Sequence, residues 1–190
     1  MIVVGAVGLN GSGKDALIKY LHERYGLPML SIGDLVRDMA ASRGILPTRS
    51  NLHQISQQAI EEYGADFFAK NAIARIEEEP WDAVGIAGIR TPADVRTFRE
   101  RYGDNFVRVY VRVAEPRTRF ERLRKRGDAR DPESYERFLR QDQEEKEMFR
   151  IEEAVEEADI TIDNSGSLEE FHREIDTQVA RPVLAEEGLV

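Results

Sequence analysis

The sequence predicts an α/β fold with a mainly parallel sheet flanked by helices. Short apolar runs alternate along the chain with longer segments of helical periodicity, which is the pattern of strands joined by crossover helices. A glycine-rich turn lies between the first apolar run and the first helical segment. With 190 residues the chain is long enough for one sizeable core, and we expect a single domain over residues 1–190.

Five apolar runs account for the strands of the expected sheet. The first, IVVGAV, is interpreted as a buried strand rather than a signal peptide, because no basic segment precedes it and it runs directly into the glycine-rich turn. The strands are expected at Ile2–Val7, Met29–Ser31, Ala83–Ala87, Phe106–Val113 and Asp159–Ile162.

The helical segments are bounded by residues that favour helix ends. The first helix is expected to start in the glycine-rich turn and to end at about Tyr25, because Gly26 and Pro28 follow. A last helix is expected after Ser167, where SLEE is a capping-box pattern. We expect the tail after Arg181 to be loosely ordered. The remaining helices are expected at Asp34–Arg43, Asn51–Tyr63, Asp66–Glu78, Ala93–Tyr102, Pro116–Arg126 and Pro132–Phe149.

The composition is that of an ordinary soluble globular protein, with 41% hydrophobic and 33% charged residues. No apolar run approaches the roughly 18 residues of a membrane span. The absence of cysteine excludes disulfides, thiolate metal sites and thiol catalysis, and a cytoplasmic location is expected. A net charge of −9 disfavours binding to nucleic acid or to anionic membranes. One basic stretch stands out in this acidic chain, PRTRFERLRKRGDAR at 116–130.

The turn after the first strand has the sequence of a phosphate-binding loop. GLNGSGKD matches G-x-x-x-x-G-K and lies between a strand and a helix, which is the context that this motif requires. Glycines allow backbone N–H groups to turn toward a phosphate, the helix N-terminus adds partial positive charge, and Lys14 reaches the β- and γ-phosphates of a nucleotide. The residues expected to bind a nucleotide here are Gly8, Asn10, Gly11, Ser12, Gly13, Lys14 and Asp15.

Asp15 occupies the position at which this loop usually carries Ser or Thr. A carboxylate in the first turn of a helix is stabilised by the helix dipole, by about 0.3–1 kcal/mol. It is also a hard oxygen ligand of the kind that Mg²⁺ prefers. Both roles are open for Asp15 on the sequence alone.

Four further segments resemble nucleoside monophosphate kinases of the P-loop kinase superfamily. SIGDLVR (31–37) resembles the segment that opens the acceptor site in adenylate kinases, and GIAGIRTPADV (85–95) resembles their third strand with its acceptor-binding arginine. RFERLRKRG (119–127) resembles the helix that leads into an arginine-rich lid, and ADITIDNSGSLEEF (158–171) is similar to the last strand and loop of dephospho-CoA kinases. The chain is also similar to adenylate-kinase-like archaeal-type ATPases and to deoxynucleoside monophosphate kinases. The resemblance to P-loop kinases covers residues 1–177.

The resemblance implies a P-loop NTPase kinase fold with a five-stranded parallel sheet, an acceptor-binding insert over residues 34–78 and a lid over residues 117–140. It implies ATP and Mg²⁺ as cofactors. Arginine suits the transfer of a phosphoryl group, because its planar fork meets phosphate oxygens bidentately. The residues implied are, for catalysis, Lys14, Arg90, Arg122, Arg126 and Arg130; for ATP beyond the loop, Arg122, Asn164 and Gly166; and for the acceptor, Asp34, Arg37, Arg90 and Arg140.

The chain departs from these relatives in two places. Ala87 stands where their third strand often ends in an Asp that helps to hold the waters of magnesium, and we expect Asp15 and Asp34 to form the metal site instead. The insert GILPTRSNLHQISQQAIEEYGADFF (44–68) carries polar residues that either read a base or a sugar or form the solvated face of a helix. These residues are Arg49, Asn51, Gln54, Gln57 and Gln58.

Together these features favour an enzyme that uses Mg-ATP to phosphorylate a small acceptor. A nucleoside or deoxynucleoside monophosphate is the leading acceptor, followed by dephospho-CoA, and neither nucleic acid nor a membrane is an expected partner. The alternative, favoured by Ala87, is a nucleotide-binding regulator or slow ATPase that does not transfer phosphate. His22, His53 and His172 lack the spacing of a metal site, and EEKEMFRIEEAVEEAD (144–159) is expected to be a solvated helix surface.

Overall fold

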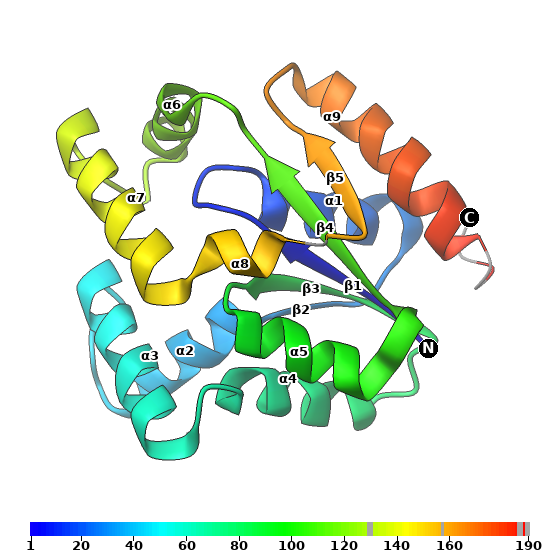
Figure 1. Ribbon diagram of the computed structural model, residues 1–190, viewed down its shortest axis with the longest axis horizontal. Coiled ribbons are helices and arrows are strands. Elements are labelled where there is room, and N and C mark those ends of the chain that lie inside the picture. The colour runs from blue at the N-terminus through cyan, green and yellow to red at the C-terminus, as the bar shows by residue number, and fades with distance from the viewer. Residues whose placement is uncertain (129–130, 157, 186–187, 189–190) are drawn as a thin grey trace.

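A five-stranded parallel sheet forms the centre of the computed structural model, which describes residues 1–128, 131–156, 158–185 and 188. Every strand pair in the sheet is parallel, and the strand order is β2-β3-β1-β4-β5 (Figure 1). The strands are β1 (Ile2–Val7), β2 (Met29–Ser31), β3 (Ala83–Ile89), β4 (Phe106–Arg112) and β5 (Ile160–Asp163). The predicted fold class and all five predicted strands are confirmed.

Strand β1 lies at the middle of the sheet and supplies side chains to both faces. Val3 pairs in register with Val84 of β3 on one side and with Phe106 of β4 on the other. Val3 belongs to the hydrophobic core on one face, whereas Val4 belongs to the core on the opposite face. A strand that is buried on both faces has an apolar residue at nearly every position, which explains why IVVGAV lacks the alternation of a half-exposed strand.

Helices cover both faces of the sheet. One core is built from α2 (Ile32–Ser42), α3 (Arg49–Tyr63), α4 (Phe67–Glu77), α5 (Pro92–Tyr102) and the short α8 (Ile151–Val155). The other is built from α1 (Lys14–Tyr25), α9 (Leu168–Ile175) and the π-helical continuation of α9 over Asp176–Leu184. The two remaining helices are α6 (Pro116–Arg126) and α7 (Tyr135–Phe149). They pack on each other through a small apolar cluster of their own, formed by Phe120, Leu123, Tyr135 and Phe138.

Three details differ from the sequence-based expectations. Helix α7 begins at Tyr135 and not at Pro132, because the Ser134 hydroxyl caps it by accepting a hydrogen bond from the backbone N–H of Arg137. Helix α8 was not expected. The prediction of a loosely ordered tail is wrong as far as Leu184, which is fully buried against the second core; residues 186–187 and 189–190 lie outside the described part of the chain.

A buried ion pair joins α6 and α7, the two helices of the predicted lid, which we call the lid helices. Arg119 of α6 is only 2% exposed and donates from Nη1 and Nη2 to the two carboxylate oxygens of Asp142 on α7, at 2.5 and 2.7 Å. Its guanidinium also lies 5.1 Å from the centre of the Phe138 ring. Because the apolar cluster between α6 and α7 is small, this bidentate pair fixes how the two helices pack.

Asp142→Asn should therefore destabilise the protein strongly. The change leaves the buried Arg119 charge without its counter-ion, and breaking a buried ion pair in this way costs about 3–5 kcal/mol of unfolding free energy. Urea denaturation followed by circular dichroism measures the loss. The matched control is Glu144→Gln, which neutralises an exposed carboxylate on the same helix and should change stability by no more than about 0.5 kcal/mol. Equal effects of the two substitutions would contradict a structural role for the ion pair.

Candidate active site

The phosphate-binding loop connects the end of β1 to the start of α1 and packs closely against its surroundings. Gly11 has φ +78°, and a Cβ atom there would lie 2.7 Å from the carbonyl oxygen of Arg119. Gly13 has φ +102°, and a Cβ atom there would lie 2.3 Å from Nδ2 of Asn164. Both positions thus require glycine for backbone conformation and for space.

The loop presents polar groups that suit a polyphosphate. Gly13 caps α1 without a side-chain hydrogen bond, so the N–H groups of the first helical turn are left for a ligand. Lys14 is 4% exposed, and its Nζ lies 3.7 Å from the Asp15 carboxylate. Burial lowers the pKa of Lys14, and the Asp15 carboxylate acts against this. The buried Ser12 hydroxyl has no hydrogen-bond partner among the described residues.

Asn164 lies beside this loop, and Gly166 follows it two residues later in the chain. The buried Asn164 side chain donates from Nδ2 to the carbonyl oxygen of Ser12 at 2.8 Å, so it supports the loop backbone. The carbonyl oxygen of Gly166 accepts a long hydrogen bond of 3.5 Å from Nη2 of Arg122. The contact of Asn164 is structural in this state, and contact of either residue with adenine stays a prediction.

A cavity of about 360 Å³ opens next to the loop, and Asn10 and Asp15 belong to its wall. Helix α3 lines it along one face, with Arg49 and His53 near its start and Ile60 eleven residues after Arg49, which is about 16 Å along a helix axis. The charged groups that line the cavity are Asp15, Lys19, Asp34, Arg37, Arg49, Arg90, Asp94 and Arg126, and its larger apolar groups are Met29, Ile32, Val36, Leu52, Ile60, Phe68 and Phe149. The wall of the cavity therefore combines many charged groups with apolar groups that come mainly from α2, α3 and α4.

The two predicted acceptor arginines both line this cavity. Arg37 forms an ion pair with Asp34, one turn earlier on α2. Arg90 follows β3, and its guanidinium lies 5.2 Å from the centre of the Phe149 ring. Two residues far apart in the sequence thus present their guanidinium groups to one space, as an acceptor phosphate would require.

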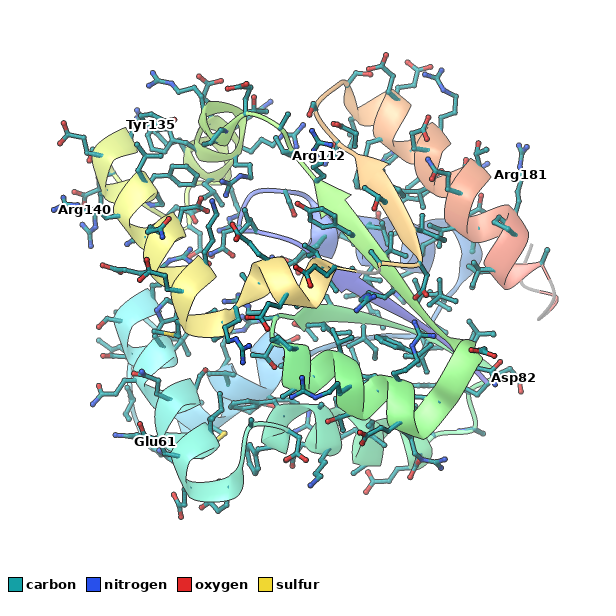
Figure 2. All side chains as sticks on the ribbon, in the orientation of Figure 1. Glu61, Asp82, Arg112, Tyr135, Arg140 and Arg181 are labelled. Atoms are coloured by element: carbon teal, nitrogen blue, oxygen red, sulfur yellow. The ribbon has the colours of Figure 1, made fainter. Side chains whose placement is uncertain are left out.

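The lid arginines are distributed differently from the prediction. Arg126 lines the cavity and donates from Nε to Asp131 at 3.0 Å, whereas Arg122 does not line it, and burial lowers the pKa of Arg122. Arg140 is exposed on α7 and points away from the body of the protein (Figure 2), so its position does not support the predicted contact with an acceptor. Its helix buries the opposite stripe, which contains Phe138 and Asp142. Arg130 lies outside the described residues.

The expected magnesium ligands also lie on the cavity. Asp15 is 63% exposed, and the neighbouring Lys14 ammonium lowers its pKa, so it is a carboxylate at neutral pH. Asp34 lies on the same cavity but is engaged by Arg37. Ala87 lines the cavity too, and it stands where the third strand of the resembled kinases often ends in an Asp. Among the described residues no group of three or more His, Asp or Glu side chains is arranged to hold a cation. Of the two expected ligands, Asp15 is the one without an arginine ion pair, and its carboxylate fits Mg²⁺, for which nucleotide phosphates and water would be the further ligands.

The polar residues of the insert fall mainly on the solvated face of α3. Gln54, Gln57 and Gln58 are exposed and do not line the cavity, and the Asn51 side chain donates to the carbonyl oxygen of Leu46 at 2.9 Å. Arg49 is the exception, because it lines the cavity. His53 and Ser56, which the sequence analysis did not select as binding residues, line the cavity in their place.

Glu145 is the main site residue that sequence reasoning missed. It lies in the acidic run that was expected to be solvated, yet it is 1% exposed. Its carboxylate accepts hydrogen bonds from the Asn10 side chain and from Arg49, and it lies 3.4 Å from Nε2 of His53. Burial acts to raise the pKa of Glu145, but the hydrogen bond with His53 and the charges of Arg90 and Arg49 outweigh it and lower the pKa to about 2. The available signal was its spacing from Phe138 and Phe149, which puts it on the buried stripe of α7.

Comparison with known proteins assigns this chain to a family. A family model described as an AAA domain matches residues 7–139. A UPF0200 protein of Pyrococcus horikoshii is 35% identical over 183 residues, which is 95% of this chain and 97% of that protein. The chain belongs to the AAA-domain and UPF0200 families. Among the described residues of this UPF0200 member, no helix combines the length and hydrophobicity that crossing a bilayer requires.

Solved structures of small-molecule kinases share the fold of this UPF0200 member at low sequence identity. A gluconokinase from Sinorhizobium meliloti 1021 has a TM-score of 0.59 and 19% identity, with 98% of this chain and 94% of that chain covered. A shikimate kinase from Acinetobacter baumannii has a TM-score of 0.58 and 13% identity, with 98% and 95% covered. The predicted P-loop kinase-like fold is confirmed.

The charge on Glu145 should make stability depend on pH in acid. Its folded-state pKa of about 2 lies below the usual value of 4.5, so its stabilising contribution is complete above pH 4.5 and is lost as the pH falls toward 2. We expect the difference in unfolding free energy between the wild type and Glu145→Gln to be largest above pH 4.5 and to shrink by about 3 kcal/mol toward pH 2. Urea denaturation on both sides of pH 4.5 measures it. A difference independent of pH would contradict the ion pairing, and the exposed Glu144→Gln serves as the control.

Proposed function

We propose that this protein is an ATP- and Mg²⁺-dependent phosphotransferase that acts on a small acceptor, a nucleoside or deoxynucleoside monophosphate. The observation that carries the proposal is the shared wall between the phosphate loop and the cavity: Asn10 and Asp15 belong to both. A donor on the loop would therefore face an acceptor in the cavity without an intervening element. With a net charge of −9, a small molecule is a better partner than nucleic acid or an anionic membrane.

In this proposal the chain acts by positioning and charge. Bound Mg-ATP would supply the phosphoryl group, with magnesium neutralising its oxygens. Lys14 and the loop N–H groups hold the donor phosphates, and Asp15 holds the metal. Arg37 and Arg90 orient the acceptor phosphate, while Arg126 adds positive charge where the two substrates meet. The lid helices above the loop exclude water, which favours transfer over hydrolysis.

The shape of the cavity supports a nucleotide acceptor. Its arginines suit a phosphate, and the apolar groups between α2, α3 and α4 suit a flat nucleobase. The structural relatives named for gluconate and shikimate suggest polyhydroxylated carboxylic acids as competing candidates. Such acceptors would need hydrogen-bonding side chains where this cavity presents Val36, Ile60 and Phe68. We therefore rank the nucleotide first and keep dephospho-CoA, gluconate and shikimate as alternatives to be measured.

A second candidate function is a nucleotide-binding regulator or slow ATPase. Ala87 favours it, because a methyl group lines the cavity where related kinases often have a carboxylate. Against it stands the set of acceptor-facing arginines, for which a simple nucleotide switch has little use.

Substitutions of Lys14 and Arg37 should separate donor binding from acceptor binding. Lys14→Ala should reduce turnover with every acceptor by at least about 100-fold, since it removes the buried cation of the loop. Arg37→Ala should raise KM for the acceptor by about 10- to 150-fold, the equivalent of one charge-assisted hydrogen bond, and should leave KM for ATP unchanged. ADP formation and direct identification of the phosphorylated product measure both effects across nucleoside and deoxynucleoside monophosphates, dephospho-CoA, gluconate and shikimate.

The exposed Arg124 on α6 provides the control, and Arg124→Ala should behave as the wild type. Equal damage by Lys14→Ala and Arg37→Ala to both KM values would contradict the assignment of Arg37 to the acceptor. Nucleotide binding without turnover on any acceptor would favour the regulator.

Asp15→Ala should change the response to magnesium. Without the carboxylate, about 10- to 100-fold more Mg²⁺ should be needed for half-maximal ATP binding, because a metal ligand is lost. ATP binding in the absence of metal should become tighter, because the carboxylate no longer repels the phosphates. Calorimetric titration of ATP at a series of Mg²⁺ concentrations measures both. An unchanged requirement for Mg²⁺ would remove Asp15 from the metal site, and Asp38→Ala, an exposed carboxylate on α2, is the control.

A further inference from the structure

Three parts of the chain meet at the buried carboxylate of Glu145. Glu145 is on α7, and it accepts hydrogen bonds from Asn10 in the phosphate loop and from Arg49 at the start of α3. His53, one turn further along α3, lies 3.4 Å from the same oxygen that Arg49 contacts. The lid, the donor site and the wall of the acceptor cavity are thus joined by a single side chain.

The contact with Asn10 is reinforced by the other lid helix. The carbonyl oxygen of Asn10 accepts a hydrogen bond of 3.2 Å from Nη1 of Arg119, while its side chain donates to Glu145. Both α6 and α7 therefore hold the same residue of the loop, and Arg119 is itself tied to α7 through Asp142. A displacement of the loop at Asn10 has to be transmitted to Glu145.

The contact with α3 extends to the far end of the cavity. Arg49 and His53 lie on the face of α3 that continues through Leu52, Ser56 and Ile60, all of which line the cavity. Helix α3 contains no proline or glycine at which it would kink, so a shift of Arg49 and His53 is carried along the part of the acceptor wall that α3 forms. Arg49 also lies 3.9 Å from Asp131, between the two lid helices, which adds a second link from α3 to the lid.

The charged groups around Glu145 connect it electrostatically to a ligand on the loop. Its side chain is 2% exposed, and Arg49 and His53 of α3 contact it. The carboxylate is close enough to Lys14 to act on its pKa, and Arg90 acts on the pKa of the carboxylate. A polyphosphate on the loop would compete for these cations and would contact Asn10, the loop residue that Glu145 holds.

We infer that Glu145 is a positioning residue that couples occupancy of the phosphate loop to the position of α3. Binding on the donor side orders the acceptor wall through the connection Asn10–Glu145–Arg49/His53. This inference rests on the proposed function only in requiring that the loop bind ATP, and it is independent of the identity of the acceptor.

Hydrogen exchange of the full-length protein tests the coupling with Mg²⁺ and the non-hydrolysable analogue AMP-PNP as the probe. In the wild type, AMP-PNP should slow exchange in the loop and α1 and also by at least about five-fold in α3. In Glu145→Gln the slowing in the loop and α1 should persist, whereas that in α3 should be lost. Glu144→Gln, which neutralises the exposed neighbour on the same helix, should behave as the wild type.

A second variant keeps the test decisive if Glu145→Gln does not fold. Asn10→Ala removes only the loop side of the connection and leaves Arg49 and His53 against Glu145. At AMP-PNP concentrations that saturate this variant, as judged by slowed exchange in α1, exchange in α3 should not be slowed. A purely structural role of Glu145 predicts instead faster exchange in α7 and α3 with and without the analogue.

The outcomes separate this inference from the proposed function. Equal slowing of α3 in the wild type and in both variants would overturn the coupling, and so would slowing in the wild type that is confined to the loop and α1. Failure of the wild type to bind AMP-PNP at all would overturn the proposed function and the coupling with it. Coupling together with absence of transfer to any acceptor would support Glu145 and reject the kinase.

Discussion

The close approach of the phosphate loop to its neighbours is the constraint on which the rest of the site depends. Gly11 lies against the backbone of α6, and Gly13 lies against Asn164 at the end of β5, and neither position has room for a side chain. Strand β1, central in the sheet, carries the loop to this narrow place, and α1 begins there with uncapped N–H groups. The buried Lys14 follows from that placement, and Arg90 joins it because the parallel strands β1 and β3 end at the same edge of the sheet.

Buried charge, more than apolar packing, fixes the lid helices over the loop. The apolar cluster between α6 and α7 is small, whereas Arg119 and Asp142 form a bidentate pair and Glu145 joins Asn10 to α3. Such groups are costly to bury alone and are tolerated because each one is paired. An element held in this way has a preferred position that depends on nearby charges, which is a useful property next to a site for polyphosphate.

Two positions around the loop differ in charge from those of the resembled kinases, one by gaining a carboxylate and the other by lacking one. Asp15 is present where a hydroxyl is usual, and Ala87 is present where a carboxylate is usual, and both line the same cavity. In the proposed function, Asp15 at the start of α1 takes the role of a carboxylate near the end of β3, so the number of carboxylates available to the metal is kept. Asp34 is less available for this purpose because Arg37 engages it.

The sequence by itself determined the sheet, the helices and the phosphate loop. These features depend on local patterns: the apolar strand runs, the glycine spacing, Lys14 and the capping residues all act within a few residues of where they stand. Arg37, Arg90 and Arg126, which the resemblance to nucleoside monophosphate kinases singled out, all line the cavity, and their contact with a substrate stays a prediction.

Only the tertiary structure decided which polar helix residues face the site. Gln54, Gln57 and Arg140 point to solvent, while His53 and Glu145 are drawn inward. The partners of Glu145 lie 96 and 135 residues away, and no local pattern reports a charge whose compensation comes from so far along the chain. A glutamate in an acidic run is inexpensive to leave in water, so its burial follows from the cations and the amide that the folded chain places around it.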